Sequence, residues 1–208
     1  MREIAAHSLL PSLSLKILQG SVVDFRGDAI VNAANELGLR GCGVDGAITS
    51  AGGVNLAAAR EALPIVRDDP ELGPLRCLTG TAVLVGPGTF GSLHTPYVVL
   101  AVGPNYRLVK FRDYELDGDQ LLATAYKGIV QVCFGAPIRS IGCCLLSSGI
   151  FRGSRTIQEV VEIAVDAIQH ELEANQHQHS IQEFCFVAYT DAECQALIKC
   201  FRQRKWIS

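Results

Sequence analysis

The chain has 208 residues, of which 49% are hydrophobic and 19% are charged, and its formal net charge is −3. This length and composition fit one domain with a large buried core and exclude a disordered chain. This weakly negative net charge excludes the overall positive electrostatic field that is typical of many nucleic-acid-binding proteins. The sequence has neither a signal-peptide core nor an apolar stretch that could span a membrane, so we expect an intracellular protein of the cytoplasm or nucleus.

Apolar runs alternate with amphipathic stretches along the chain. Strands are predicted, in chain order, at residues 15–18, 29–34, 82–85, 97–102, 140–146 and 183–188. Helices are predicted at residues 44–50, 55–63, 120–135, 156–173 and 192–203. Because most of the strands are continuous apolar runs, they are typical of a sheet that is covered on both faces. The sequence therefore predicts a three-layer α/β/α domain with a mostly parallel or mixed central sheet.

The other segments carry weaker signals. Residues 63–76 are rich in proline and charge and predict a surface excursion, and the mixed charges of residues 104–119 predict a solvated loop. No element is predicted before Pro11. The eight cysteines include no C-x-x-C pair, and no histidine lies at zinc-ligand spacing from them, so we expect core or surface thiols. We expect neither a metal nor a cofactor.

Two loops have the composition of an anion-binding site. Residues 35–45 and 145–155 each follow a predicted strand, contain small residues and lead into a predicted helix. In α/β folds ligands bind where strands end and helices begin, because the free N–H groups and the dipole of a helix N-terminus attract anions. Two such loops at one edge of a sheet could hold the two phosphates of a diphosphate.

Four motifs together resemble the macrodomain family, an α/β/α fold that recognises ADP-ribose. They are DAIVNAAN at residues 28–35, GCGVDGAI at 41–48, VGP at 102–104 and SSGIF at 147–151. The second motif is similar to the glycine loop of the MacroD-type hydrolases, and the fourth is similar to the family's second phosphate loop. The motifs follow the family's order between about residues 20 and 167, which implies a single macrodomain over residues 1–208 with a terminal helix at 190–208.

The resemblance implies roles for individual residues. Asn35 and Asp45 would be the catalytic pair: Asn35 would hold the hydroxyls of the distal ribose, and Asp45 would activate or position a water beside the scissile ribose–acyl bond. Repulsion by the bound phosphates would raise the basicity of Asp45. Phe151 would stack over or orient the distal ribose. The residues expected to bind ADP-ribose are Ser21, Val22, Asn32, Gly41, Cys42, Gly43, Val44, Ser147, Ser148, Gly149, Ile150 and Phe151.

Taken one at a time, these residues also fit purely structural roles. Asparagine is common where a strand turns, so Asn32 and Asn35 could simply end the strand. A carboxylate at the start of a helix, such as Asp45, could simply complement the helix dipole. The functional interpretation therefore depends on the whole set of motifs.

The chain differs from the family's pattern at both ends of the expected site. Ser21 stands where the family has an aspartate that binds the adenine amino group, and Asp24 follows three positions further on. Asp24 could replace that aspartate only if the local turn brings it to the site. After Phe151, the charges of Arg152 and Arg155 predict a more basic rim.

The first loop also differs from the pattern. Arg40 and Cys42 interrupt its run of glycines, and Thr49 stands where hydrolases of this type often have histidine. We expect Arg40 to face solvent and the loop to move less than a run of four glycines.

The motifs indicate an ADP-ribose-binding hydrolase that removes mono-ADP-ribose from proteins and could also deacetylate O-acetyl-ADP-ribose. The alternative is a non-catalytic reader of ADP-ribose or of ADP-ribosylated proteins, which the altered glycine loop favours. Residues 41–46 also spell G-x-G-x-x-G, so another nucleotide-binding α/β module stays open on that pattern alone. We expect a monomer whose partner is ADP-ribose or an ADP-ribosylated protein, without a membrane or nucleic-acid partner.

Overall fold

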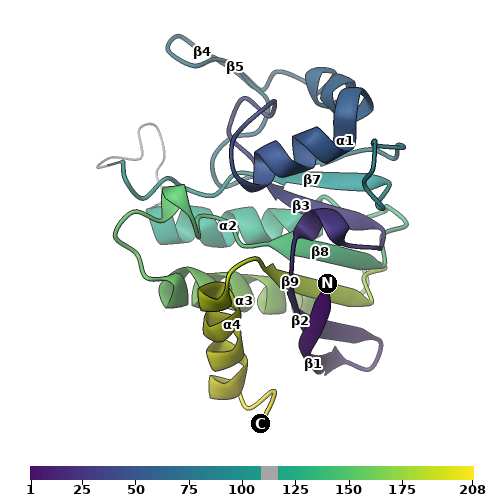
Figure 1. The fold of residues 1–208 in the computed structure, drawn as a ribbon, viewed down its shortest axis with the longest axis vertical. Helices are drawn as coiled ribbons and strands as arrows, with labels where there is room; N and C mark the ends of the chain where they lie inside the picture. The colour runs from purple at the N-terminus through teal and green to yellow at the C-terminus, as the bar shows by residue number, and fades with distance from the viewer. Residues whose placement is uncertain (109–116) are drawn as a thin grey trace.

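The computed structural model describes residues 1–108 and 117–208 and shows a seven-stranded sheet between two layers of helices (Figure 1). The sheet contains β1 (Arg2–Leu10), β2 (Leu13–Gln19), β3 (Ala29–Ala33), β6 (Ala82–Val85), β7 (Tyr97–Ala101), β8 (Ser140–Cys144) and β9 (Glu183–Ala188). The helices are α1 (Val44–Glu61), α2 (Gly118–Gln131), α3 (Ile157–Ala174) and α4 (Asp191–Gln203), with 3₁₀ turns η1 (Val22–Asp24) and η2 (Ile150–Arg152). The predicted α/β/α class with a mixed sheet is confirmed.

The sheet has the strand order β1-β2-β9-β8-β3-β7-β6. Its five central strands, from β2 to β7, pair in parallel, and only the edge strands β1 and β6 pair antiparallel. The carboxyl ends of the five parallel strands therefore lie at one edge of the sheet. Ligand sites of open α/β sheets form at this edge.

Alternate residues of each strand pack into two separate apolar cores, because successive side chains point to opposite faces. Val31 and Val99 belong to the larger core, which lies under α2, α3 and α4. Ile30 and Leu100 belong to the smaller core with Ile48 of α1. This covering of both faces explains why the central strands are continuous apolar runs.

Three helices begin with the same motif, a capping box. Asp117, Thr156 and Thr190 each cap a helix by accepting a hydrogen bond from the backbone N–H three residues later. The side chain of that third residue, a glutamine or glutamate, bonds back to the N–H of the cap. These reciprocal pairs satisfy N–H groups that have no acceptor within the helix, so the starts of α2, α3 and α4 are set by local sequence.

Helix α1 is sharply kinked at Gly53, where φ is 61° and ψ is −156°. Figure 1 shows the change of direction between its two segments. A left-handed φ suits glycine, since a side chain would strain the backbone there. The two helices predicted at 44–50 and 55–63 correspond to the two segments on either side of this kink.

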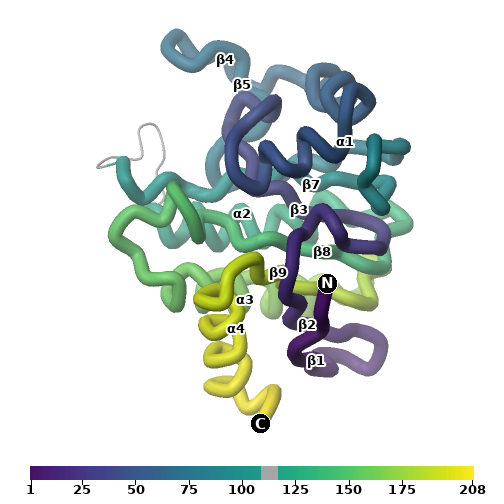
Figure 2. The backbone as a smooth tube through the Cα atoms, viewed as in Figure 1, coloured from purple at the N-terminus to yellow at the C-terminus, as the bar shows by residue number. Residues whose placement is uncertain are grey.

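Several boundaries differ from the sequence prediction. Residues 2–10, where no element was predicted, form β1, an edge strand paired to β2. The excursion at 63–76 contains a two-stranded hairpin of β4 (Arg67–Asp69) and β5 (Gly73–Leu75), which projects from the body of the molecule (Figure 2). Strand β8 ends at Cys144 rather than at residue 146. The centre of the loop predicted at 104–119 lies outside the described residues.

All eight cysteines are free thiols, and only Cys42 among them is exposed. The prediction of core or surface thiols is therefore confirmed. Within the two described parts of the chain, no helix combines the length and the apolar character needed to cross a bilayer.

Tyr126 of α2 anchors the chain where it leaves β8. Its ring is fully buried, and its hydroxyl accepts a 2.7 Å hydrogen bond from the backbone N–H of Leu146. Burial raises the pKa of this phenol well above its usual value, so the hydroxyl stays neutral. The bond fixes the first part of the loop that follows β8.

We expect Tyr126→Phe to lower the free energy of unfolding by about 1–3 kcal/mol, because it leaves the N–H of Leu146 buried without an acceptor. Urea unfolding measures this loss. Tyr97→Phe is the matched control: Tyr97 is 8% exposed, and its hydroxyl makes no hydrogen bond to another described residue. An equal loss in both variants would contradict the assignment.

Candidate functional site

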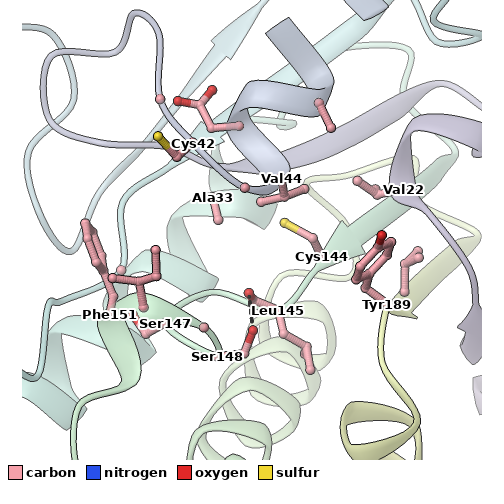
Figure 3. Close-up of a pocket in the computed structure, with 18 of the residues that line it drawn as sticks. Val22, Ala33, Cys42, Val44, Cys144, Leu145, Ser147, Ser148, Phe151 and Tyr189 are labelled. Atoms are coloured by element: carbon pink, nitrogen blue, oxygen red, sulfur yellow. Dashed lines mark hydrogen bonds between the residues drawn. The ribbon is translucent and has the colours of Figure 1, made fainter. Parts of the chain in front are cut away.

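A cavity of about 750 Å³ opens at the carboxyl edge of the sheet (Figure 3). Its walls come from the segments that follow β2, β3, β7, β8 and β9 and from the start of α1. Every predicted site residue except Asn32 lines it, namely Ser21, Val22, Asn35, Gly41, Cys42, Gly43, Val44, Asp45, Ser147, Ser148, Gly149, Ile150 and Phe151. The structure therefore brings together segments that are up to 130 positions apart in the sequence, as from Ser21 to Phe151.

The glycine loop runs from the end of β3 to α1. It turns at Asn35, whose carbonyl accepts a 3.0 Å hydrogen bond from the N–H of Gly38, and whose Nδ2 donates to the carbonyl of Arg40 at 3.3 Å. Gly43 precedes the helix with φ of 63°, a conformation that suits glycine. This path delivers the first amides of α1, which have no acceptor within the helix, to the cavity wall. The side chain of Arg40 is exposed, as predicted.

Asp45 is buried, with 2% of its surface exposed. Its Oδ1 accepts a 2.7 Å hydrogen bond from Nδ2 of Asn32 and lies 2.9 Å from Nη1 of Arg60. The hydroxyl of Thr49 lies further away, at 3.5 Å. The other oxygen, Oδ2, has no hydrogen-bond partner among the described residues. One oxygen of the carboxylate is therefore anchored, and the other lies buried beside Gly41 of the glycine loop.

The alternation of side chains along β3 explains where Asn32 points. Ile30 faces the core beneath α1, so Asn32, two residues later, faces the same side. There the amide meets Asp45 at the start of the helix. Asn32 does not line the cavity in this structure, and its amide supports Asp45 from behind.

Arg60 is the main residue of this site that the sequence prediction missed. Only 1% of its surface is exposed, and its guanidinium contacts Asp45, donates to the hydroxyl of Thr49 at 2.8 Å and donates to the carbonyl of Gly38 at 2.7 Å. A signal did exist, because Arg60 lies four positions after the buried Leu56 and so on the same face of the helix. A charged side chain at this position of a helix is usually exposed to solvent, so the sequence alone did not indicate that Arg60 is buried.

The second loop, after β8, is held from two sides. Ser147 has a positive φ of 52°, and its hydroxyl donates to the carbonyl of Pro104 at 2.8 Å. Gly103 is required beside it, because a Cβ there would lie 2.4 Å from Oγ of Ser147. The side chain of Ile150 stays 64% exposed at the rim. The loop therefore presents small residues, Ser147 to Gly149, followed by the larger side chains of Ile150 and Phe151 to the cavity.

A third wall, after β9, was also missed. Tyr189, Thr190 and Glu193 line the cavity, and the ring of Tyr189 is 76% exposed. Glu193 accepts hydrogen bonds from the N–H groups of Tyr189 and Thr190 at 2.9 and 3.0 Å and from the hydroxyl of Ser148 at 2.8 Å. The T-x-x-E pattern of Thr190 and Glu193 could have identified the helix start but not its contact with the second loop.

Two thiols contribute to the cavity. Cys42 is exposed on the glycine loop, and Cys144 lies at the end of β8 (Figure 3). Burial raises the pKa of the Cys144 thiol to about 12, so this group is neutral at physiological pH and acts as an apolar surface.

The structure decides the place of Asp24, which the sequence left open. Asp24 does not turn toward the cavity; it is exposed beside a separate hollow that Lys16 and Glu183 also line. The reason is that Ser21 caps η1: its hydroxyl accepts a 3.4 Å hydrogen bond from the N–H of Val23, and the turn carries Asp24 away.

The two arginines of the predicted basic rim have different partners. Arg152 donates from Nε to the carbonyl of Ser148 at 3.1 Å, and Arg155 forms ion pairs with Asp119 at 2.6 Å and with Glu159 at 3.3 Å. Both arginines are therefore committed to internal bonds that fold the second loop. The charge of Arg155 is balanced by these two carboxylates, whereas Arg152 bonds to a carbonyl and keeps its positive charge beside the cavity.

We expect Asp45→Asn to lower the free energy of unfolding by about 3 kcal/mol, because it leaves the buried guanidinium of Arg60 without an anionic partner. The double variant Asp45→Asn/Arg60→Met should recover part of this loss, since the uncompensated charge is then gone. Urea unfolding of both single variants and the double variant gives the coupling energy. Strict additivity of the two losses would contradict the pairing.

The chain matches known proteins over most of its length. The Macro domain family model matches residues 31–164. A macro domain-containing protein of Caldanaerobacter subterraneus subsp. tengcongensis is 32% identical over 189 residues, which cover 91% of this chain and 96% of that protein. A Pantoea vagans protein named O-acetyl-ADP-ribose deacetylase 1 is 31% identical over 177 residues, which cover 84% of this chain and 92% of that protein.

Solved structures share the fold. The Oceanobacillus iheyensis macrodomain with ADP superposes with a TM-score of 0.80 at 23% identity, covering 99% of this chain and 98% of that chain. The Trypanosoma brucei macrodomain in complex with ADP-ribose superposes with a TM-score of 0.70 at 27% identity, covering 89% of this chain and 68% of that chain. The family match, the relatives and the sheet with its cavity at the carboxyl edge together show that this chain belongs to the macrodomain family.

Proposed function

We propose that this macrodomain binds ADP-ribose, removes mono-ADP-ribose from acidic side chains of proteins and deacetylates O-acetyl-ADP-ribose. The observation that carries the proposal is the convergence of Asn35 and Asp45 beside Gly41. A Cβ on Gly41 would lie 2.3 Å from Oδ2 of Asp45 and 3.3 Å from Nδ2 of Asn35, so both groups lie at one point of the cavity wall. Relatives named O-acetyl-ADP-ribose deacetylase support the same reaction class.

The polar atoms at this point suit a ribose and a water molecule. Oδ1 of Asn35 and Oδ2 of Asp45 are buried and have no hydrogen-bond partner among the residues that the structure describes. A buried polar atom without a partner is costly, so a ligand that supplies hydroxyl groups there gains hydrogen bonds at little loss. The amide of Asn35 both donates and accepts, which matches the hydroxyls of a ribose.

The diphosphate fits between the two loops. On one side, the start of α1 offers free backbone amides and the positive end of the helix dipole. On the other side, the second loop offers the backbone of Ser148 and Gly149. The cavity volume of about 750 Å³ is within the range of sites that enclose small-molecule ligands.

The residues at the two ends of the pocket suggest where the two ends of ADP-ribose bind. Phe151 and Tyr189 lie at opposite ends of it, and Val22 lies near Tyr189 (Figure 3). We place the distal ribose toward Phe151 and Asn35, and the adenine toward Tyr189, whose exposed ring can stack on a base. Ser21 lines the same wall and offers a neutral hydroxyl where other macrodomains would offer a carboxylate.

The reaction adds water across the ribose–acyl bond and releases ADP-ribose and a carboxylic acid. In this placement Oδ2 of Asp45 accepts a hydrogen bond from the attacking water and orients it toward the bond. Asn35 fixes the ribose so that the bond stays within reach. The thiol of Cys144 in the cavity wall is neutral, so it adds no charge beside the phosphates.

We expect Asp45→Asn to lower turnover by at least about 100-fold, because an amide orients water poorly and carries no charge. Asn35→Ala should weaken ADP-ribose binding by about tenfold, since it removes hydrogen bonds to the ribose. The measurements are release of ADP-ribose from an auto-ADP-ribosylated protein, release of acetate from O-acetyl-ADP-ribose, and calorimetry with ADP-ribose. Circular dichroism verifies that each variant is folded at the assay temperature.

The outcomes separate the candidate functions. Tight ADP-ribose binding without turnover by the wild-type protein would identify a reader. Turnover that survives in Asp45→Asn together with Asn35→Ala would overturn the assigned site. The absence of any binding heat with ADP-ribose would overturn both functions.

We expect Tyr189→Ala to weaken ADP-ribose binding by about tenfold or more, whereas Tyr189→Phe should retain nearly wild-type affinity, because stacking requires the ring and not the hydroxyl. Calorimetry with ADP-ribose measures the affinity, and ribose 5-phosphate, which lacks the base, is the control ligand. A similar loss with both ligands would show that Tyr189 does not contact the adenine.

A further inference from the structure

Arg60 is a buried cation that the hydrolysis described above does not itself use. Asp45 and Arg60 are separated by 15 positions along α1, which in a straight helix would place their Cα atoms about 22 Å apart. The kink at Gly53 turns the second half of the helix back and allows the guanidinium to reach Oδ1 of Asp45 at 2.9 Å. The sequence therefore maintains this contact through a special backbone conformation.

The contact divides the carboxylate into two unequal oxygens. Oδ1 is held by Asn32 of β3 and by Arg60, while Oδ2 lies buried beside Gly41 without a partner among the described residues. Rotation of the carboxylate would break both bonds of Oδ1. Because Nε of Arg60 also donates to the carbonyl of Gly38, the same guanidinium fixes the glycine loop relative to Asp45.

The charge of Arg60 has no competitor in contact with Asp45 among the described residues. The groups that face the carboxylate are the amide of Asn32 from β3, the hydroxyl of Thr49 from α1 and the neutral thiol of Cys144 from β8. A buried carboxylate that loses its only cationic partner favours the protonated form. Asp45 would then present a neutral acid at the position where water must be oriented.

We propose that Arg60 is a positioning residue for the hydrolysis: it holds Asp45 as a carboxylate and keeps Oδ2 turned toward Gly41 of the glycine loop. The inference rests on the proposed function, and it adds the residue that compensates the charge of the water-orienting carboxylate and fixes its orientation. Arg60 itself does not line the cavity, so it acts only through Asp45 and Gly38.

The test compares Arg60→Gln, which removes the charge and keeps hydrogen-bond donors, with Arg60→Lys, which keeps the charge. We expect kcat of Arg60→Gln to fall about tenfold or more at the acid end of the pH profile and to recover toward the wild-type value as the pH rises, because a buried carboxylate without a cationic partner favours the protonated acid. In Arg60→Lys, the fall of kcat on the acid side of the pH–rate profile (its acid limb) should stay close to that of the wild type. KM should change less than kcat in both variants.

Leu56→Ala is the matched control, since Leu56 is fully buried on the same face of α1, carries no charge and does not line the cavity. It should lower the thermal stability without moving the acid limb of the rate profile. A drop in kcat that is independent of pH in Arg60→Gln, or an equal shift in Leu56→Ala, would overturn the proposal and leave a structural role only.

A second measurement decides the inference without turnover. Carbon-13 NMR of the aspartate side-chain carboxyls follows the ionisation of Asp45 directly, with Asp45→Asn to assign its signal. The titration of Asp45 should move to higher pH in Arg60→Gln and stay near the wild-type position in Arg60→Lys. If the wild-type protein shows no hydrolysis, the proposed function fails; if the Asp45 titration is the same in wild type and Arg60→Gln, this inference fails.

Discussion

Parallel pairing of five adjacent strands is the constraint on which the rest of this molecule depends. Because β2, β9, β8, β3 and β7 run in the same direction, the loops that follow them emerge at one edge of the sheet. Each loop contributes little by itself: a serine after β2, an asparagine after β3, a glycine after β7, two serines after β8 and a tyrosine after β9. Their common edge turns these separate groups into one cavity with two distinct ends.

The charged centre of the site depends on burial. Asp45 stands at a helix N-terminus, where exposure to solvent is the ordinary arrangement, yet it is enclosed between β3 and the second half of α1. Asn32 and Arg60 compensate its charge within the protein, since a buried carboxylate needs a cation and hydrogen-bond donors. The kink at Gly53 makes this possible. A glycine far from the cavity therefore contributes to its chemistry.

The outer wall of the site is held by a second carboxylate with a different task. Glu193 joins the start of α4 to Ser148 of the second loop, and its hydrogen bonds occupy both of its oxygens. It is therefore less suited than Asp45 to act on a ligand, although both line the cavity. Arg152 is likewise occupied by a carbonyl of the second loop. The contrast between occupied and free polar atoms distinguishes supporting residues from candidate binding residues.

The sequence by itself determined the layered α/β class, most of the strands and helices, and two loops with the composition of a phosphate site, because these features follow from local apolar patterns and from motifs that are continuous in the chain. The tertiary structure alone decided the rest. Edge strand β1 lacks a continuous apolar run and forms by pairing with β2. Arg60 reaches Asp45 only through a backbone kink, Tyr189 joins the site only because β9 lies beside β8, and Asp24 turns away because Ser21 caps a 3₁₀ turn. Contacts between distant residues depend on the path of the backbone and on packing, which no local pattern encodes.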